Sequence, residues 1–348
     1  MEPSNYLQVS SSNGKEGEEA STWQTVGPIT ASNNDDCNTE SNCQQEAPKR
    51  QYTKALPLHV KHLLAPHATI KSHRKSKYLY RHSHDKIDTN LLVFLHGAGD
   101  SHTIYHALGR KLSIPQCATL SLHASCMNDS NERDGRDKCG FEALPFGLGW
   151  SWFQEMDYNT GLPLNKTSSC YKSSLERAAT QLDNLLDDLT SIGEEDDSSS
   201  GGWIPERIFL FGFSAGACLA MQTCAHRIQK TKRPLGGAMC IAGGARIVDN
   251  VTDNEDGIDA TPVLLVVGEK DQKFQTSDAK EAASRYNNSI HNNGVKTSVA
   301  KIHIVKGKKE HVMMNTQEEV RAVMEFCGEN MIRRTMAMEG YCEVHPGA

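Results

Sequence analysis

The sequence predicts an α/β fold: a mostly parallel, doubly wound sheet flanked by helices. Short apolar runs without polar alternation recur along the chain, as is typical of strands that are buried on both faces. These runs are residues 91–95, 118–122, 207–211, 238–241 and 263–267. Segments with the 3.6-residue period of amphipathic helices lie between the runs, and strands that alternate with such helices form parallel sheets.

A sixth run, residues 298–305, alternates more with polar side chains, so we expect it nearer the edge of the sheet. Two capping-box sequences, at 173–176 and 316–319, predict helix starts. The first precedes an apolar stripe made of Leu175, Ala178, Ala179, Leu182, Leu185, Leu186 and Leu189. The second precedes a closing helix whose expected inward residues are Val320, Val323, Met324 and Cys327.

The strongest motif is Gly-Phe-Ser-Ala-Gly at 212–216, which follows the run 207–211 and precedes a helix-prone stretch, 217–228. In this strand–turn–helix context, Gly-x-Ser-x-Gly forms a nucleophile elbow. The residues two before and two after the serine are small, and the serine hydroxyl stands above the sheet. We therefore predict that Ser214 is a nucleophile and that the N–H of Ala215 points at an acyl oxygen. The structural alternative is a tight turn with an inert serine.

The loop after the first buried run reads His-Gly-Ala-Gly-Asp at 96–100. Its glycines let the backbone approach a substrate closely, so the N–H of Ala98 is the predicted second donor of an oxyanion hole. His96 is expected to be structural, with its ring holding the loop.

The α/β-hydrolase fold orders its catalytic triad as serine, acid, histidine along the chain. Asp271, in the turn after the run 263–267, is the predicted acid, and Glu269 is the alternative. His311 follows the last strand and is the predicted base, whereas His303, within that strand, is expected to be packed or at the surface. Asp271 would orient His311, and His311 would take the proton of the attacking serine, giving an acyl-enzyme that water hydrolyses.

Together with the segments 152–153 and 204–216, these motifs resemble the phospholipase/carboxylesterase family of α/β-hydrolases, which includes the acyl-protein thioesterases. The similarity runs from about residue 90 to about residue 330. The resemblance implies hydrolysis of acyl esters or thioesters, such as lysophospholipid or S-palmitoyl cysteine, with no metal or cofactor. It also implies that Trp152 and Phe153 lie near the substrate channel, and the alternative is that they are plain core or lid aromatic residues.

Two positions and one short segment depart from the family pattern. Ala215 stands where the family commonly has Gln, and Ala217 where it often has a further Gly. Residues 272–275 read Gln-Lys-Phe-Gln where Pro-x-Val is usual. The backbone donor survives the first two changes because every residue except proline supplies an N–H, so the departures concern the acyl-protein substrate more than the chemistry.

Composition divides the rest of the chain. Residues 1–50 hold eight acids, three bases and few large apolar side chains, which predicts a disordered acidic, polar tail. Residues 51–88 are a basic, His-rich lead-in, expected to be solvated and partly extended. The catalytic domain is expected over 89–335, with the polar segment 126–149 as an insertion or lid, and 336–348 as a C-terminal tail.

The charge and hydropathy of the chain limit the classes of partner that we expect. After residue 50 the chain holds 35 acids and 34 bases, so nucleic acid is not an expected partner. No apolar run approaches the ~18 residues of a membrane span, and no signal peptide is evident, so we expect a cytoplasmic protein without stable membrane insertion. The basic patch 71–77 leaves nuclear import or contact with an anionic membrane as alternatives.

The expected partner is an acylated small molecule, lipid or acyl-protein substrate. No His-Glu-x-x-His sequence or spaced Cys/His cluster occurs, so a metal or cofactor is not expected. Two other hypotheses about the function remain open. One is an inert α/β-hydrolase acting as a binding module, and the other is a peptidase or acyltransferase on the same fold. Cys218, on the helix after the elbow, is expected to be a packed thiol and not a second nucleophile.

Overall fold

The computed structural model describes residues 53–64, 78–124, 142–144, 148–157, 160–191, 202–230, 233–244, 260–288 and 299–332. These residues belong to one compact unit, residues 50–348. The expected tails 1–50 and 336–348, the basic patch 71–77 and most of the expected insertion 126–149 lie outside the described residues.

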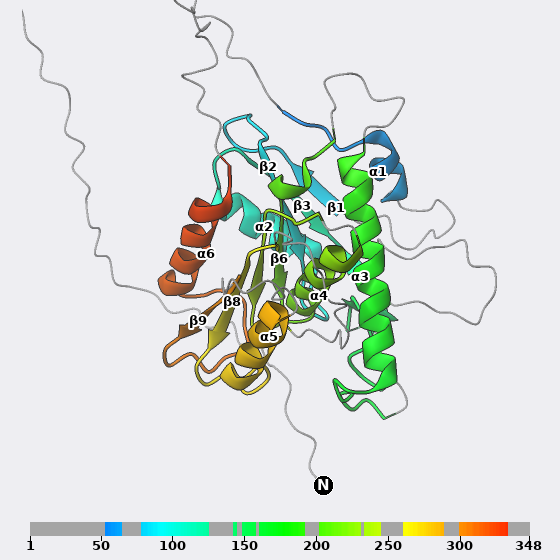
Figure 1. Cartoon of the computed structure of the whole chain (residues 1–348), viewed down its shortest axis with the longest axis vertical. Helices are drawn as coiled ribbons and strands as arrows, with labels where there is room; N and C mark the ends of the chain where they lie inside the picture. Colours follow the sequence, from blue (N-terminus) through cyan, green and yellow to red (C-terminus); the bar gives the residue numbers. More distant parts are fainter. Residues whose placement is uncertain are drawn as a thin grey trace, which may run out of the picture. The chain divides into compact units, whose positions relative to one another are not determined.

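Seven strands form one mixed sheet in the order β1-β3-β2-β6-β7-β8-β9 (Figure 1). The strands are β1 (Tyr78–Arg81), β2 (Asn90–Leu95), β3 (Cys117–Leu122), β6 (Ile208–Phe213), β7 (Gly237–Ile241), β8 (Val263–Gly268) and β9 (Ala300–Val305). Neighbouring strands are parallel except for β1, which is antiparallel to β3. A separate antiparallel pair joins β4 (Glu142–Ala143) to β5 (Trp150–Ser151). The predicted architecture, a mostly parallel sheet flanked by helices, is confirmed.

The strand positions follow from burial. Every residue of β2, β3, β6, β7 and β8 is buried, which explains why apolar residues dominate these strands. In β3 the buried set also includes the polar Thr119 and Ser121, which alternate with its apolar residues. β9 forms one edge of the sheet and keeps exposed side chains at Lys301 and Ile304, as its alternation predicted. This edge matters for function because the chain turns from β9 into the loop that carries His311.

Helices cover both faces of the sheet (Figure 1). They are α1 (Leu58–Leu63), α2 (His102–Leu112), α3 (Ser169–Thr190), α4 (Ala215–Lys230), α5 (Thr276–Asn288) and α6 (Gln317–Asn330). Because side chains of a strand point alternately to opposite faces, β2 contributes Leu91 and Val93 to the core under α1, α3, α4 and α5. Its other face contributes Leu92 and Phe94 to a second core under α2 and α6. Within the described ranges, no helix has the length and apolar character that crossing a membrane requires.

One predicted helix start was wrong. α3 begins at Ser169, and the hydroxyl of Ser168 caps it by accepting from the N–H of Tyr171. The Ser-x-x-Glu sequence 173–176 therefore lies inside the helix, since a serine one turn earlier already satisfies the first free N–H groups. The predicted apolar stripe is confirmed, because all seven of its residues are buried.

The closing helix matches its prediction at the start but not along its whole face. α6 begins with the expected capping box, in which Thr316 and Glu319 bond reciprocally. Val323 and Cys327 are buried and Met324 is half-buried against the second core, but Val320 is 38% exposed, so its predicted inward position was wrong. Glu319 takes the inward position instead, with 1% of its surface exposed.

The lead-in is more structured than the sequence predicted. Leu56, Val60 and Leu64 are buried around α1, and His59 Nε2 lies 2.8 Å from the carbonyl of Asp188 on α3. The expectation of a solvated, extended segment was wrong for these residues. Their spacing of four residues places them on one helical face, a signal that the dominant positive charge of the segment obscured.

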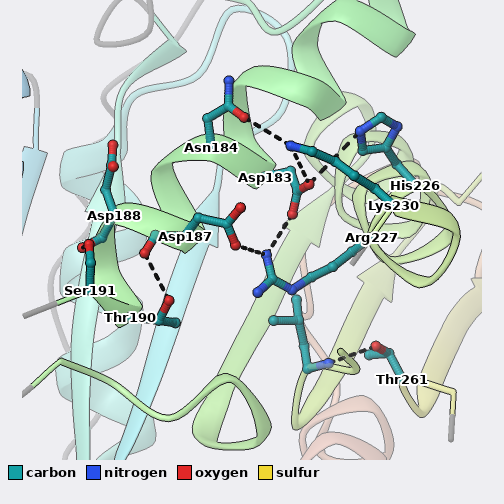
Figure 2. Close-up of polar contacts among 11 residues, drawn as sticks. Asp183, Asn184, Asp187, Asp188, Thr190, Ser191, His226, Arg227, Lys230 and Thr261 are labelled. Atoms are coloured by element: carbon teal, nitrogen blue, oxygen red, sulfur yellow. Dashed lines mark hydrogen bonds and ion pairs between the residues drawn. The ribbon is translucent and has the colours of Figure 1, made fainter. Parts of the chain in front are cut away.

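A buried charge network links α3 to α4 (Figure 2). The Arg227 guanidinium, 1% exposed, donates to Asp183 Oδ1 at 2.6 Å and to Asp187 Oδ1 at 2.8 Å. Lys230 Nζ lies 3.5 Å and His226 Nε2 3.9 Å from the other oxygen of Asp183. Asp183 is fully buried, so its charge depends on the cations of Arg227 and Lys230 for compensation.

Candidate active site

The elbow forms where β6 meets α4. Ser214 has a φ of 50°, in the left-handed region that a non-glycine residue occupies only when its surroundings hold it there. Its N–H donates to the carbonyl of Ile241 on β7 at 2.9 Å, and its carbonyl accepts from the N–H of Cys218 at 3.0 Å. The serine backbone is therefore fixed on both sides, to the sheet and to the first turn of α4.

Two glycines make this turn possible. A Cβ on Gly212 would stand 2.3 Å from the carbonyl oxygen of Gly216, across the turn. A Cβ on Gly216 would stand 2.2 Å from the carbonyl oxygen of Leu95 and 2.7 Å from that of His96. The second contact brings the start of α4 against the end of β2, so the missing side chain of Gly216 lets the elbow approach the loop 96–100.

Three predicted residues meet above the sheet. His311 Nε2 lies 3.0 Å from Ser214 Oγ, and His311 Nδ1 lies 2.8 Å from Asp271 Oδ2. The Asp271 side chain is 1% exposed and that of His311 is 12% exposed, so water reaches the imidazole only at its margin. The ring of Phe213 lies against the imidazole, with centroids 5.5 Å apart. The structure thus brings together Ser214, Asp271 and His311 from three separate loops.

Backbone N–H groups hold the Asp271 carboxylate on the side away from His311. Its Oδ1 accepts from the N–H of Lys273 at 2.8 Å and of Phe274 at 3.2 Å, which leaves Oδ2 for the imidazole. Glu269, the alternative acid, instead accepts from the N–H of Gly307 at 2.9 Å. His303, the alternative base, lies half-buried on β9 with its Nε2 3.3 Å from Glu318 Oε1.

The loop 96–100 is tied down on both sides of Ala98. The N–H of Gly97 donates to the Tyr105 hydroxyl at 3.2 Å, and the N–H of Gly99 donates to the carbonyl of Trp150 at 3.0 Å. Ala98 itself is exposed. The N–H of Ala215 heads α4, where the first N–H groups have no intrahelical acceptor and carry the positive end of the helix dipole. The two predicted oxyanion donors therefore lie between hydrogen-bonded glycines, for Ala98, and in the first turn of α4, for Ala215.

Residues 81–323 match the family model described as phospholipase/carboxylesterase. The chain belongs to this family. A hydrolase of Mycosarcoma maydis described as uncharacterised is 26% identical over 255 residues, which cover 72% of this chain and 80% of that protein. A second uncharacterised hydrolase, from Schizosaccharomyces pombe, is 26% identical over 159 residues, 46% of this chain and 54% of that protein.

Solved structures share the fold. Esterase PE8 aligns with a TM-score of 0.51 at 20% identity, covering 73% of this chain and 98% of that one. Acyl-protein thioesterase 2 of Zea mays aligns with a TM-score of 0.50 at 15% identity, with the same coverage. At these identities the likeness establishes the α/β-hydrolase fold and not the substrate.

In this family member, Trp152 and Phe153 are fully buried. The indole N–H of Trp152 donates to the carbonyl of His96 at 2.6 Å, directly before the loop that carries Ala98. Phe153 packs edge-on against Tyr171, with ring centroids 5.1 Å apart. Trp152 therefore supports the backbone at the start of the loop 96–100, and contact of either ring with a substrate stays a prediction.

His96 holds the loop as expected. Its Nε2 accepts from the N–H of Ala124 at 3.0 Å, so the proton of the neutral ring sits on Nδ1, which lies 2.7 Å from the carbonyl of Gly97. Burial lowers the pKa of His96 to about 3, and the nearby His123 and His102 add to this depression.

This pKa predicts an acid-sensitive fold. Between pH 6.5 and about 3 the unfolded chain binds a proton at His96 that the folded chain rejects. As the pH is lowered through this range, the free energy of unfolding should therefore decrease. His96 contributes about 1.4 kcal/mol of this decrease per pH unit. Urea denaturation of the wild type and of His96→Gln, which does not titrate, measures the difference. Equal slopes in the two proteins would contradict the prediction.

Sequence reasoning missed Lys308, whose side chain is 5% exposed and forms a buried ion pair with Glu319. Glu319 was identified as the last residue of the capping-box sequence 316–319, a pattern that does not indicate a buried carboxylate. No sequence signal distinguishes Lys308 from its exposed neighbours Lys306 and Lys309. Its inward position depends on the path of the loop that carries His311.

Proposed function

We propose that this protein is a serine hydrolase that cleaves carboxylic ester or thioester acyl bonds through an acyl-enzyme on Ser214. The observation that carries the proposal is one imidazole, His311, within hydrogen-bond distance of both Ser214 Oγ and Asp271 Oδ2. A nucleophile hydrogen-bonded to a base, which is hydrogen-bonded in turn to an orienting acid, makes up the serine hydrolase triad. Membership of the phospholipase/carboxylesterase family supports the same chemistry.

The geometry supports a role for each residue. With Nδ1–H donated to Asp271, the lone pair of His311 Nε2 faces the serine hydroxyl and can accept its proton as Oγ attacks the acyl carbon. The imidazolium then protonates the leaving alkoxide or thiolate. Water, activated by the same imidazole, hydrolyses the acyl-enzyme and restores Ser214.

The negative charge of the tetrahedral intermediate would be bound by the N–H groups of Ala98 and Ala215. Fixed backbone donors suit this role because they need no reorganisation as charge develops, and one such donor contributes roughly 100- to 1000-fold to rate in a hydrolase where it was removed. Gly97 and Gly99, which are hydrogen-bonded on either side of Ala98, keep the first donor in place.

The proposed chemistry does not specify which molecule carries the acyl group. An esterase and an acyl-protein thioesterase both appear among the fold relatives, so the acylated partner is proposed to be a small molecule, a lipid or a protein. A panel of p-nitrophenyl esters from acetate to palmitate, together with acyl-coenzyme A and S-acyl peptide thioesters, ranks chain length and leaving group by kcat/KM.

The first test is labelling with a fluorophosphonate probe, which reacts with an activated serine. We expect the wild type to label, and Ser214→Ala to lose labelling and about 10⁶-fold in kcat on the best ester of the panel, because the alcohol that forms the acyl-enzyme is gone. Cys218→Ala is the matched control, since it changes a neighbouring residue on the same helix and should label normally.

Two outcomes contradict the proposal. A folded wild type that neither labels nor hydrolyses any ester or thioester would favour the binding-module reading. Labelling that survives Ser214→Ala but disappears in Cys218→Ala would move the nucleophile to the thiol.

A further inference from the structure

The loop that carries His311, residues 306–316, is organised around one buried ion pair between Lys308 Nζ and Glu319 Oε1. The two side chains are 5% and 1% exposed. Each charge makes further hydrogen bonds to the backbone of the same loop. Lys308 Nζ donates to the carbonyl of Val312 at 3.1 Å, and Val312 directly follows His311.

Glu319 fixes the far end of the loop. Its Oε2 accepts from the N–H groups of Asn315 and Thr316, each at 3.0 Å, and from the hydroxyl of Thr316 at 2.9 Å. The pair therefore fixes the loop just after His311 and where α6 begins.

Lys308 also joins this loop to the one that carries the acid. Its carbonyl accepts from the N–H of Lys270 at 2.9 Å, one residue before Asp271. A Cβ on Gly268 would stand 2.9 Å from that carbonyl oxygen, so the two loops are in backbone contact. A shift of Lys308 would thus change the position of His311 relative to both Asp271 and Ser214.

An ion pair is an expensive way to fill this space. Desolvation of two charges can outweigh their attraction, and a well-packed apolar pair often gives equal or greater stability. An apolar pair cannot form the hydrogen bonds that Lys308 makes to a backbone carbonyl and that Glu319 accepts from three donors. The contacts of Lys308 and Glu319 therefore suit orientation of the loop more than stability.

We propose that Lys308 and Glu319 are positioning residues, which hold the imidazole of His311 at the distance from Ser214 that proton transfer requires. This inference rests on the proposed function, because it assigns the pair a role in that reaction. A displacement of about 1 Å in a reacting group can lower the rate by roughly 100-fold, so a loosened loop has a large effect on turnover.

The test compares Lys308→Met with the wild type on a p-nitrophenyl ester. Methionine keeps the apolar stem but removes the donors, so we expect kcat to fall by about 100-fold, KM to stay within about twofold, and fluorophosphonate labelling to slow in parallel. Lys301→Met is the matched control. It removes an exposed ion pair to Glu329 from β9, just before the same loop, and should leave both rates unchanged.

Two further variants separate positioning from folding. Lys308→Met leaves the buried carboxylate of Glu319 without Lys308, whereas Lys308→Met/Glu319→Met leaves no unpaired buried charge. We therefore expect the double variant to melt at a higher temperature than Lys308→Met while its kcat stays low. Glu319→Gln keeps one acceptor oxygen for Asn315 and Thr316 but turns its NH₂ group toward the Lys308 ammonium, so we expect kcat to fall in this variant too. A downfield proton NMR signal from His311 Nδ1–H, identified by its loss in His311→Ala, should be present in the wild type and weakened in Lys308→Met.

The outcomes distinguish the two proposals. A double variant that folds with wild-type kcat and an unchanged Nδ1–H signal would overturn the positioning role while leaving the hydrolase intact. A wild type that does not label would end the proposed function, and the positioning role with it. If Lys308→Met alone does not fold, the double variant and Glu319→Gln decide the matter by the same readouts.

Discussion

Asp271→Asn is expected to lower kcat by about 10⁴-fold without unfolding the protein. The amide can keep an acceptor oxygen toward the N–H groups of Lys273 and Phe274, so the loop keeps its shape. Its NH₂ group then faces His311 Nδ1 and donates to it. This forces the ring proton onto Nε2, the nitrogen that faces Ser214. Nε2 then has no lone pair with which to accept the serine proton.

Steady-state kinetics and probe labelling of purified Asp271→Asn measure this effect, with circular dichroism to verify the fold. Glu269→Gln is the matched control. It makes the same chemical change two residues away, on a side chain that bonds the N–H of Gly307 and can still accept that bond. We expect it to retain nearly full activity. A large loss in Glu269→Gln with little in Asp271→Asn would exchange the roles of the two acids.

The second large effect concerns stability and lies in the network between α3 and α4 (Figure 2). Asp183→Leu removes the buried carboxylate that pairs with the buried guanidinium of Arg227, and the half-exposed Asp187 stays in place. Breaking a buried pair in this way costs about 3–5 kcal/mol of unfolding free energy. For a domain of this size, that loss corresponds to a melting temperature lower by roughly 10 °C.

The double variant Asp183→Leu/Arg227→Met tests whether the loss comes from the uncompensated charge. We expect it to recover most of the stability, because an apolar pair fills the same space and Lys230 and Asp187 can turn to water. Denaturant unfolding of the wild type, both single variants and the double variant gives the coupling energy. Additive losses in the double variant would show that packing, and not charge, dominates at this site.

The parts of the site that depend on chain order could be predicted from sequence. Ser214 stands out because its glycines are required by the turn itself, and the turn appears as a motif. Asp271 and His311 could be placed because the fold fixes the order of strand ends. The structure brings both to Ser214, while Glu269 and His303 have other partners.

The parts that depend on packing between distant segments could not be predicted. Val320 was expected inward because it is apolar, but the inward position belongs to Glu319, whose partner Lys308 comes from the preceding loop. Neither residue type nor periodicity reveals that a lysine in a polar loop points inward. Likewise, the short strand β1 was missed because its four residues carry too little periodic signal, and its pairing with β3 spans about forty residues.

The antiparallel strand β1 has a consequence for anyone preparing a shorter recombinant protein. A fragment that started at residue 89 would uncover the outer edge of β3, whose row of N–H and C=O groups would be free to pair with a second molecule. It would also strip Leu56, Val60 and Leu64 from the apolar surface that they cover. Such a fragment should be prone to aggregation, so a soluble product would begin upstream of Lys54, whose N–H bonds Asp88.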